Sequence, residues 1–387
     1  KMCVHERIPD AVLIEAKAFE PLSETPSKEV VVGRLCGEAV MRGANVYSVG
    51  VLGITKGAMW NDVVAITVPY ESEATHGSEP SAFKKRVLVG YGVLEISRTR
   101  ALKHIKGDVA VRLTSCLVGL HPSLNDLFPS DCFAIGLPSM VVSHVLEPRT
   151  NEWVLDLCCG VGGKTTHISS LMKNQGLIVA LDRARSKIKK LRDRCEVLGI
   201  TNVKAFASDS KRLTKTSIEE EEDKMSLKQR RDVCTKLFEK SKMKIPIESF
   251  PFECFDRVLC DPPCTALGLR PRLNMNNVTK EDCVSMQVFQ RQFLRSSVNM
   301  LRPGGTLVFS TCTIDPIENE ENVRYVLDKF PCMKLVSQGP FHLGSTGLAS
   351  STSLSSEECK LVQRFDPTDK ELDTAGFFIS KFVKTIK

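Results

Sequence analysis

The sequence predicts an α/β fold, in which a Rossmann-like domain with a mostly parallel sheet follows a smaller β-rich domain. From Trp153 onward, short apolar strands alternate with helical segments, which is the pattern of βαβ units in a parallel sheet. Before residue 118, β-branched runs are broken by glycine, which is typical of short strands joined by tight turns. The 387 residues suffice for two or three domains of ordinary size.

Five strands and three helices are expected in the larger domain, with a further short helix at 140–146. The strands are 153–158, 177–182, 203–209, 255–261 and 306–312, and the helices are 164–174, 186–199 and 282–301. Helices that alternate with strands would cover both faces of the sheet. Residues 211–248 carry dense charges of both signs without strong apolar periodicity. We expect them to form a solvated insertion with one helix between two strands.

The composition restricts the class of protein only mildly. A net charge of +7 is compatible with an RNA-binding protein, but by itself it favours an ordinary, slightly basic enzyme. The 15 cysteines include no CxxC pair, and no metal site is expected, because nothing near Cys260 and Cys264 completes one. Many free thiols indicate a reducing compartment such as the cytoplasm. No apolar run reaches the ~20 residues of a membrane helix, so no membrane partner is expected.

A glycine-rich turn follows the first strand of the larger domain. Gly160, Gly162 and Gly163 would let the backbone turn sharply and approach a ligand closely at the start of a helix. Such a turn by itself could serve NAD, FAD, a nucleotide or S-adenosyl-L-methionine.

Acidic residues at the strand ends narrow this choice. Asp182 ends the next strand, 22 residues after Gly160, where an acid binds ribose hydroxyls in dinucleotide-binding folds. Asp209, after the third strand, is placed to accept from an adenine amino group. With Asp156 and Asp261, four strands end in aspartate; one alone is often a helix cap, but the series favours a ligand site. No second glycine-rich fingerprint is present, so S-adenosyl-L-methionine is favoured over NAD.

Two cysteines follow neighbouring strands at the same edge. The fourth strand leads into CDPPCTALG (260–268) and the fifth into STCT (310–313), so Cys264 and Cys312 would share one pocket. A single buried cysteine is common, whereas two beside a cofactor site favour chemistry. A thiolate that adds to C6 of cytosine makes C5 nucleophilic enough to take a methyl group. Asp261 could assist by hydrogen-bonding the N3/N4 edge of the base.

The ordered set LDLCCGVGGKTTHI, CDPPCTALG, LRPGG and STCTIDPIENE resembles the Sun (Nop2/Sun) family of RNA cytosine-5 methyltransferases. The resemblance runs from about Leu137 to Val383 and implies a class I S-adenosyl-L-methionine-dependent methyltransferase domain over 118–387. It implies that Cys312 attacks C6, that Cys264 assists release of the product, and that Asp261 contacts the base, with Lys164 also approaching it. The cofactor would be held by Cys158, Cys159, Gly160, Val161, Gly162, Gly163, Lys164, Asp182, Asp209 and Asp261.

Residues 27–117 resemble a PUA domain, a small β-barrel that binds structured RNA, because RGANVYSVGVLG (42–53) is similar to its signature. A PUA domain ahead of the catalytic domain is typical of the tRNA branch of the family and implies contact with the acceptor region of tRNA. Arg42, Tyr47, Lys84 and Lys85 are candidate RNA contacts, with ordinary surface residues as the alternative. The lysines of 211–248 are weaker candidates. Residues 1–26 would be a remnant of the family's N-terminal RNA-recognition-like subdomain.

The sequence also departs from the family pattern. The usual CAAPGGKT is CCGVGGKT, DAPCSG is DPPCTA, and Val49 replaces a proline of the PUA turn. Two other functions therefore stay open. DPPC differs by one residue from the DPPY motif of amino-group methylases, although that chemistry has no use for Cys312. A PUA domain joined to a degenerate methyltransferase could also bind RNA without modifying it.

Overall fold

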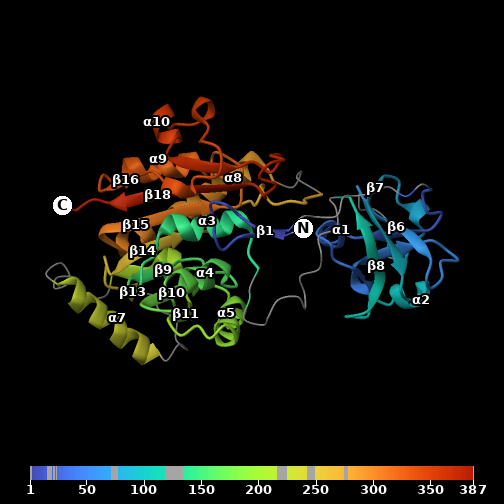
Figure 1. Ribbon diagram of the computed structural model, residues 1–387, viewed down its shortest axis with the longest axis horizontal. Helices are drawn as coiled ribbons and strands as arrows, with labels where there is room; N and C mark the ends of the chain where they lie inside the picture. The colour runs from blue at the N-terminus through green and yellow to red at the C-terminus, as the bar shows by residue number, and fades with distance from the viewer. Residues whose placement is uncertain are drawn as a thin grey trace. The chain divides into compact units, whose positions relative to one another are not determined.

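The computed structural model describes residues 2–14, 20, 22, 24–70, 77–117, 132, 134–215, 225–241, 249–273 and 278–386. The chain forms two compact units (Figure 1). The first comprises Lys1–His5, Val12–Phe128 and Arg270–Asn277, and the second comprises Glu6–Ala11, Pro129–Leu269 and Val278–Lys387. Within the described part of the chain, no helix has the length and apolar character needed to cross a membrane.

The first unit is built on a six-stranded sheet in the order β4-β8-β7-β6-β3-β5. Its pairs are antiparallel except for β3 with β6. The elements are β1 (Met2–Val4), β2 (Val12–Ile14), β3 (Glu29–Val32), α1 (Arg34–Met41), β4 (Val46–Tyr47), β5 (Val51–Ile54), β6 (Val63–Pro69), β7 (Arg86–Leu94), α2 (Arg98–Ala101) and β8 (Val109–Cys116). Valine and isoleucine side chains fill its core, as the short β-branched runs predict.

The second unit contains an eight-stranded sheet in the order β11-β10-β9-β14-β15-β18-β16, with β17 paired to β18. Its strands are β9 (Trp153–Asp156), β10 (Leu177–Asp182), β11 (Val203–Ala207), β14 (Phe255–Cys260), β15 (Leu301–Thr311), β16 (Met333–Leu335), β17 (Val362–Phe365) and β18 (Phe377–Lys384). The five expected strands are all present and parallel to their neighbours among the five. The order runs outward in both directions from β9 and β14, and open α/β sheets bind ligands at such a switch point.

Helices cover both faces of this sheet (Figure 1). They are α3 (Leu137–Leu146), α4 (Gly163–Leu171), α5 (Arg185–Val197), α7 (Leu227–Ser241), α8 (Lys280–Met300), α9 (Glu320–Lys329) and α10 (Ser356–Cys359). Because strand side chains alternate, neighbouring residues of β10 belong to different cores: Ile178 lies in the cluster that contains residues of α3 and α4, whereas Val179 lies in the cluster that contains residues of α7, α8 and α9. The fully buried strands explain why their sequences read as nearly continuous apolar runs.

The structure corrects one expectation about the charged insertion. Its single expected helix is present as α7, but this helix is not simply solvated. Cys234 and Phe238, one helical turn apart, are buried in the core beside Phe206 and Phe250. Two buried apolar residues among many charged ones are too few to produce a recognisable helical periodicity in the sequence. The rest of the insertion at 216–224 and 242–248 lies outside the described residues.

Candidate active site

The glycine-rich turn joins β9 to α4, and two glycines set its path. Gly160 and Gly162 have φ values of +55° and +95°, which glycine adopts without strain. At Gly162 a Cβ atom would also lie 2.3 Å from a side-chain carbon of Leu191. A Cβ atom at Gly160 would have no neighbour within 4 Å. The turn therefore packs tightly against α5 on one side and leaves space for a ligand near Gly160.

Asp182, the last residue of β10, fastens this turn to the neighbouring strand. Its carboxylate accepts hydrogen bonds from the backbone N–H of Gly160 at 3.1 Å and of Ala184 at 2.8 Å. Asp209 follows β11 at the same edge of the sheet, and its carboxylate lies 3.7 Å from the Lys211 ammonium. Both carboxylates stand at the carboxyl ends of β10 and β11, the two strands on one side of β9, where a nucleoside would bind.

Asp156 has a different position, beneath the turn. This last residue of β9 is 1% exposed, and it accepts from the Thr165 hydroxyl at 2.7 Å and the Cys158 N–H at 3.2 Å. Burial raises the pKa of its carboxyl group to about 7, against the opposing effect of the Thr165 hydrogen bond. These contacts make Asp156 a support for the turn and for the start of α4.

The two cysteines of the turn face the protein interior. Cys159 packs with the α5 core, and its N–H donates to the Leu181 carbonyl at 2.9 Å. Cys158 packs against the core on the other face. Burial raises the pKa of both thiols, so both stay protonated at neutral pH. They offer a cofactor their backbone rather than a reactive sulfur.

Lys164, Asp261 and Ser310 form a connected polar group. The Lys164 ammonium donates to Asp261 Oδ2 at 2.7 Å, and the Ser310 hydroxyl donates to Oδ1 at 2.8 Å. Burial would lower the pKa of Lys164, but the charge of Asp261 and the hydrogen bond outweigh it and raise the pKa. The ammonium also lies 5.2 Å from the ring centroid of Phe377. Lys164 is therefore a fixed cation in this site.

Cys264 and Cys312 come together at the ends of β14 and β15. Their sulfur atoms are 3.2 Å apart, within hydrogen-bond distance. The hydrogen bond from Cys264 lowers the pKa of Cys312, with help from the Lys164 charge and against burial and Asp261. The same contact raises the pKa of Cys264. The backbone N–H of Gly268 donates to the Cys312 carbonyl at 3.0 Å, which fastens the two loops together.

A buried carboxylate beneath the cysteine loops was not anticipated. Glu318 is fully buried and accepts from the Thr265 N–H at 3.2 Å, from the Thr265 hydroxyl, and from the Gln290 amide at 2.7 Å. The Thr265 hydroxyl also lies 2.9 Å from the Thr313 hydroxyl. Burial raises the pKa of Glu318. The ENE segment contains Glu318, but only the fold shows which loop this carboxylate supports.

The predicted residues of the larger domain thus gather at one edge of one sheet. The candidate RNA contacts Arg42, Tyr47, Lys84 and Lys85 belong to the first unit, where all four side chains are exposed. Their exposure agrees equally with RNA contact and with an ordinary surface. Ser310, Gln290 and Glu318 are site residues that sequence reasoning missed, although Ser310 begins the STCT motif.

The sheet order, the glycine-rich turn at its switch point and the strand-end carboxylates define an S-adenosyl-L-methionine-dependent methyltransferase of class I. The family described as 16S rRNA methyltransferase RsmB/F matches residues 143–383. The tRNA (cytosine(72)-C(5))-methyltransferase NSUN6 of Mus musculus is 34% identical over 98% of this chain and 79% of its own length. The tRNA (cytosine(72)-C(5))-methyltransferase of Pyrococcus horikoshii is 33% identical over 92% of this chain and 75% of its own length.

Among solved structures, NSun6 from Pyrococcus horikoshii with SFG aligns with a TM-score of 0.74 and 30% identity. That alignment covers 100% of this chain and 85% of the other. The chain belongs to the Sun family of RNA methyltransferases, which includes the RsmB/F enzymes, and to its tRNA branch.

Proposed function

We propose that this RNA cytosine-5 methyltransferase acts on a cytosine in the acceptor region of tRNA, through a covalent bond from Cys312 to C6 of the base. The observation that carries the proposal is the 3.2 Å contact between the sulfur atoms of Cys264 and Cys312 beside the carboxylate of Asp261. An amino-group methylase needs no such pair of thiols.

The two thiols are unequal, and this supports distinct roles. A hydrogen bond from Cys264 and the nearby Lys164 charge favour the thiolate of Cys312. Since the thiolate is the nucleophile, Cys312 is the residue that adds to C6. Cys264 keeps its proton and donates it in the hydrogen bond to Cys312, so it is not a second nucleophile. We assign Cys264 to product release, the step in which a base removes the C5 proton and Cys312 leaves C6 as a thiolate.

Asp261 and Lys164 are suited to the polar edge of the base. Ser310 and Lys164 hold the two oxygens of Asp261, which fixes the carboxylate before any base arrives. A carboxyl group that hydrogen-bonds N3 and N4 stabilises positive character on the ring and assists thiolate addition to C6. The Lys164 cation offsets negative charge on Asp261 and on the Cys312 thiolate.

The cofactor residues fit S-adenosyl-L-methionine, which supplies the methyl group to C5. The turn from Cys158 to Lys164 would hold it through backbone atoms in the space beside Gly160. Asp182 would bind the ribose hydroxyls, and Asp209 would accept from the adenine amino group. Asp261 would lie between the cofactor and the base.

The choice of tRNA rests on two lines of support. The relatives of mouse and Pyrococcus horikoshii carry the name tRNA (cytosine(72)-C(5))-methyltransferase, so cytosine 72 is the proposed target. The first unit, proposed as a PUA domain, presents exposed Arg42, Tyr47, Lys84 and Lys85. Cationic side chains of this kind bind phosphates and position the RNA without reading its sequence.

The test is incubation of the purified chain with tritiated S-adenosyl-L-methionine and tRNA transcripts, followed by nucleoside analysis. We expect label in 5-methylcytidine at position 72 and none in a transcript with uridine there. Cys312→Ser should abolish transfer while cofactor binding is retained. Cys264→Ala should accumulate a protein–RNA adduct that survives denaturants.

Cys359→Ala, a buried cysteine outside the site, is the matched control and should behave like the parent chain. Label in an N-methylated nucleoside would overturn the reaction class. Methyl transfer by Cys312→Ser at the parental rate would overturn the covalent mechanism. Label in 5-methylcytidine at another position of the tRNA would overturn the assignment to cytosine 72.

A further inference from the structure

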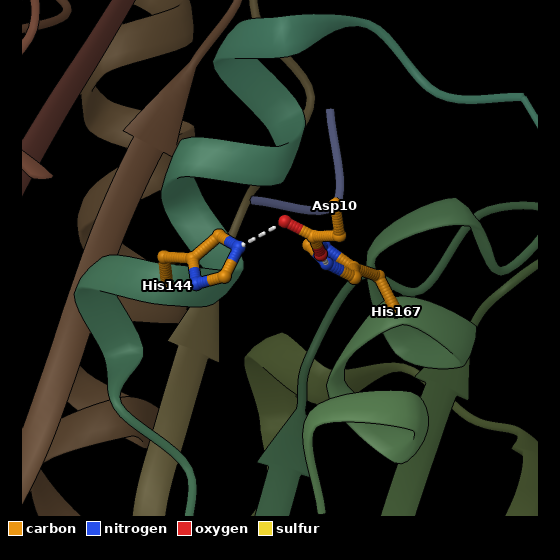
Figure 2. A group of neighbouring side chains, drawn as sticks. All are labelled: Asp10, His144 and His167. Atoms are coloured by element: carbon orange, nitrogen blue, oxygen red, sulfur yellow. Dashed lines mark hydrogen bonds and ion pairs between the residues drawn. The ribbon is translucent and has the colours of Figure 1, made fainter. Parts of the chain in front are cut away.

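Asp10, His144 and His167 meet at one point of the second unit, although they come from three separate segments. Asp10 lies in the segment Glu6–Ala11, His144 on α3 and His167 on α4 (Figure 2). His144 Nε2 is 2.7 Å from one carboxylate oxygen of Asp10, and His167 Nε2 is 2.5 Å from the other. None of the three belongs to the proposed methyl-transfer chemistry.

We propose that Asp10, His144 and His167 form a binding site for a divalent transition-metal ion, with zinc as its occupant, which fastens the segment Glu6–Ala11 to α3 and α4. The potential ligand atoms of the three residues all lie within 4.8 Å of one another. Two imidazoles and one carboxylate are a ligand set that zinc uses in proteins, with water completing the coordination. This inference does not depend on the proposed function.

The surroundings of the three side chains suit such a site. The side chains of His144 and His167 are only 9% and 10% exposed, so their positions are set by packing; His144 stacks on Phe341 with ring centroids 4.9 Å apart. The Asp10 side chain is 37% exposed, which leaves one side open to water.

The geometry requires a small adjustment. Ligand atoms around tetrahedral zinc stand ~3.3 Å apart for bonds of about 2.0–2.1 Å, so Asp10 must withdraw by less than ~1 Å from each ring. The two histidine ligand atoms, which lie within 4.8 Å of each other, must also come to this separation. Asp10 lies in a short surface segment, whereas both histidines are on helices. A histidine that binds a metal through Nε2 carries its ring proton at Nδ1. Binding would therefore exchange the two contacts with Asp10 for metal–ligand bonds.

The outer contacts set the expected affinity. Metal-bound histidines usually donate the second ring N–H to a partner, and loss of that partner costs about 10–100-fold in affinity. His167 Nδ1 is buried without a hydrogen-bond partner within the described part of the chain. We therefore expect zinc binding about 10–100-fold weaker than in a site with complete outer contacts.

The experiment uses the full chain, reduced and stripped of metal. Zinc is titrated against a chromophoric chelator, and cobalt(II) serves as a spectroscopic probe. We expect one equivalent bound through nitrogen and oxygen, without the sulfur-to-cobalt charge-transfer band of thiolate ligands. Because the two site thiols could also bind zinc, Cys264→Ser/Cys312→Ser should retain this equivalent.

Asp10→Asn should bind this equivalent of zinc at least tenfold more weakly than the parent chain. It should also no longer gain thermal stability from zinc. This substitution changes a partly exposed side chain and keeps its volume, so it leaves the fold intact. Asp366→Asn, an exposed carboxylate of the same unit, is the matched control and should bind like the parent. Unchanged zinc affinity in Asp10→Asn, or no equivalent in the Cys264→Ser/Cys312→Ser chain, would overturn the proposal. The cluster would then be a metal-free hydrogen-bonded clamp.

Discussion

Replacement of Glu318 tests whether the carboxylate beneath the cysteine loops holds them in their working positions. In Glu318→Ala, the Thr265 N–H and one Gln290 N–H lose the acceptor that they have at 3.2 Å and 2.7 Å. The Thr265 hydroxyl keeps Thr313 as a partner at 2.9 Å. A buried donor deprived of its acceptor costs about 1–3 kcal/mol; the Thr265 N–H is partly buried and the Gln290 amide keeps the Pro263 carbonyl at 3.0 Å, so the second unit should lose about 1–4 kcal/mol of stability.

The effect on catalysis follows from the position of Thr265, directly after Cys264. A displacement of a reacting group by about 1 Å can cost 10²-fold in rate. We therefore expect kcat to fall about 10–100-fold in Glu318→Ala, with S-adenosyl-L-methionine affinity unchanged, because Glu318 does not touch the cofactor turn. Glu318→Gln keeps one acceptor oxygen and should lie between Glu318→Ala and the parent in both measurements.

The assays are denaturant unfolding, single-turnover methyl transfer to tRNA, and calorimetric titration of the cofactor. Glu321→Gln is the matched control, since Glu321 accepts hydrogen bonds from Ser353 at the surface. If Glu318→Ala unfolds at the same denaturant concentration as the parent and keeps kcat within about twofold, the reasoning from buried donors is refuted.

Three further predictions concern the backbone and charges of the site. The pKa of Asp156 rises from 3.8 to about 7 on folding, so the native state binds the extra proton and loses stability as pH rises through that window. The destabilisation of Asp156→Asn should therefore shrink by about 2–3 kcal/mol from pH 5 to pH 8, measured by denaturant unfolding at both values. Ala266, with φ of +55°, should accept glycine with a gain of up to about 1 kcal/mol in unfolding free energy and unchanged kcat. Gly162→Ala should lower stability by about 2–5 kcal/mol and weaken cofactor binding in calorimetry, because its Cβ overlaps Leu191.

The sequence was sufficient for the parts of the fold that repeat a simple pattern. Strands buried on both faces must be apolar, so the sequence predicted strands at 153–158 and 177–182. The ends of these predicted strands agree with those of β9 and β10 to within two residues. The antiparallel strand β18 was not identified as a strand, although the resemblance to the family extends to about Val383, which lies within it. The strand β17, rather than a helix that would mark a βαβ unit, comes directly before it, and its pairing with β15 joins residues some seventy positions apart.

The residues of the site also divide into those whose neighbours follow from a repeated sequence pattern and those whose neighbours depend on the folded chain. Cys264 and Cys312 could be placed together from the sequence because each follows a strand, and parallel strands end at one edge of the sheet. Glu318 could not be assigned to Thr265, since their contact depends on how one loop folds beneath another. Asp10 and His167, 157 positions apart, share no pattern at all, so only the folded chain reveals their hydrogen bond.

The departures from the family pattern in the cofactor turn bear on whether the chain is a working enzyme. Val161 stands where the family has proline, yet its side chain is 39% exposed and its carbonyl accepts a hydrogen bond from Arg194. The path of the turn comes instead from the positive φ values of Gly160 and Gly162 and from the Asp182 carboxylate. Gly162 is unchanged from the family motif, whereas Gly160 replaces an alanine of that motif. Neither these glycines nor Asp182 depends on the residue at position 161. The substitution therefore removes a side chain that the turn does not use, and it gives no reason to expect a degenerate, non-catalytic domain.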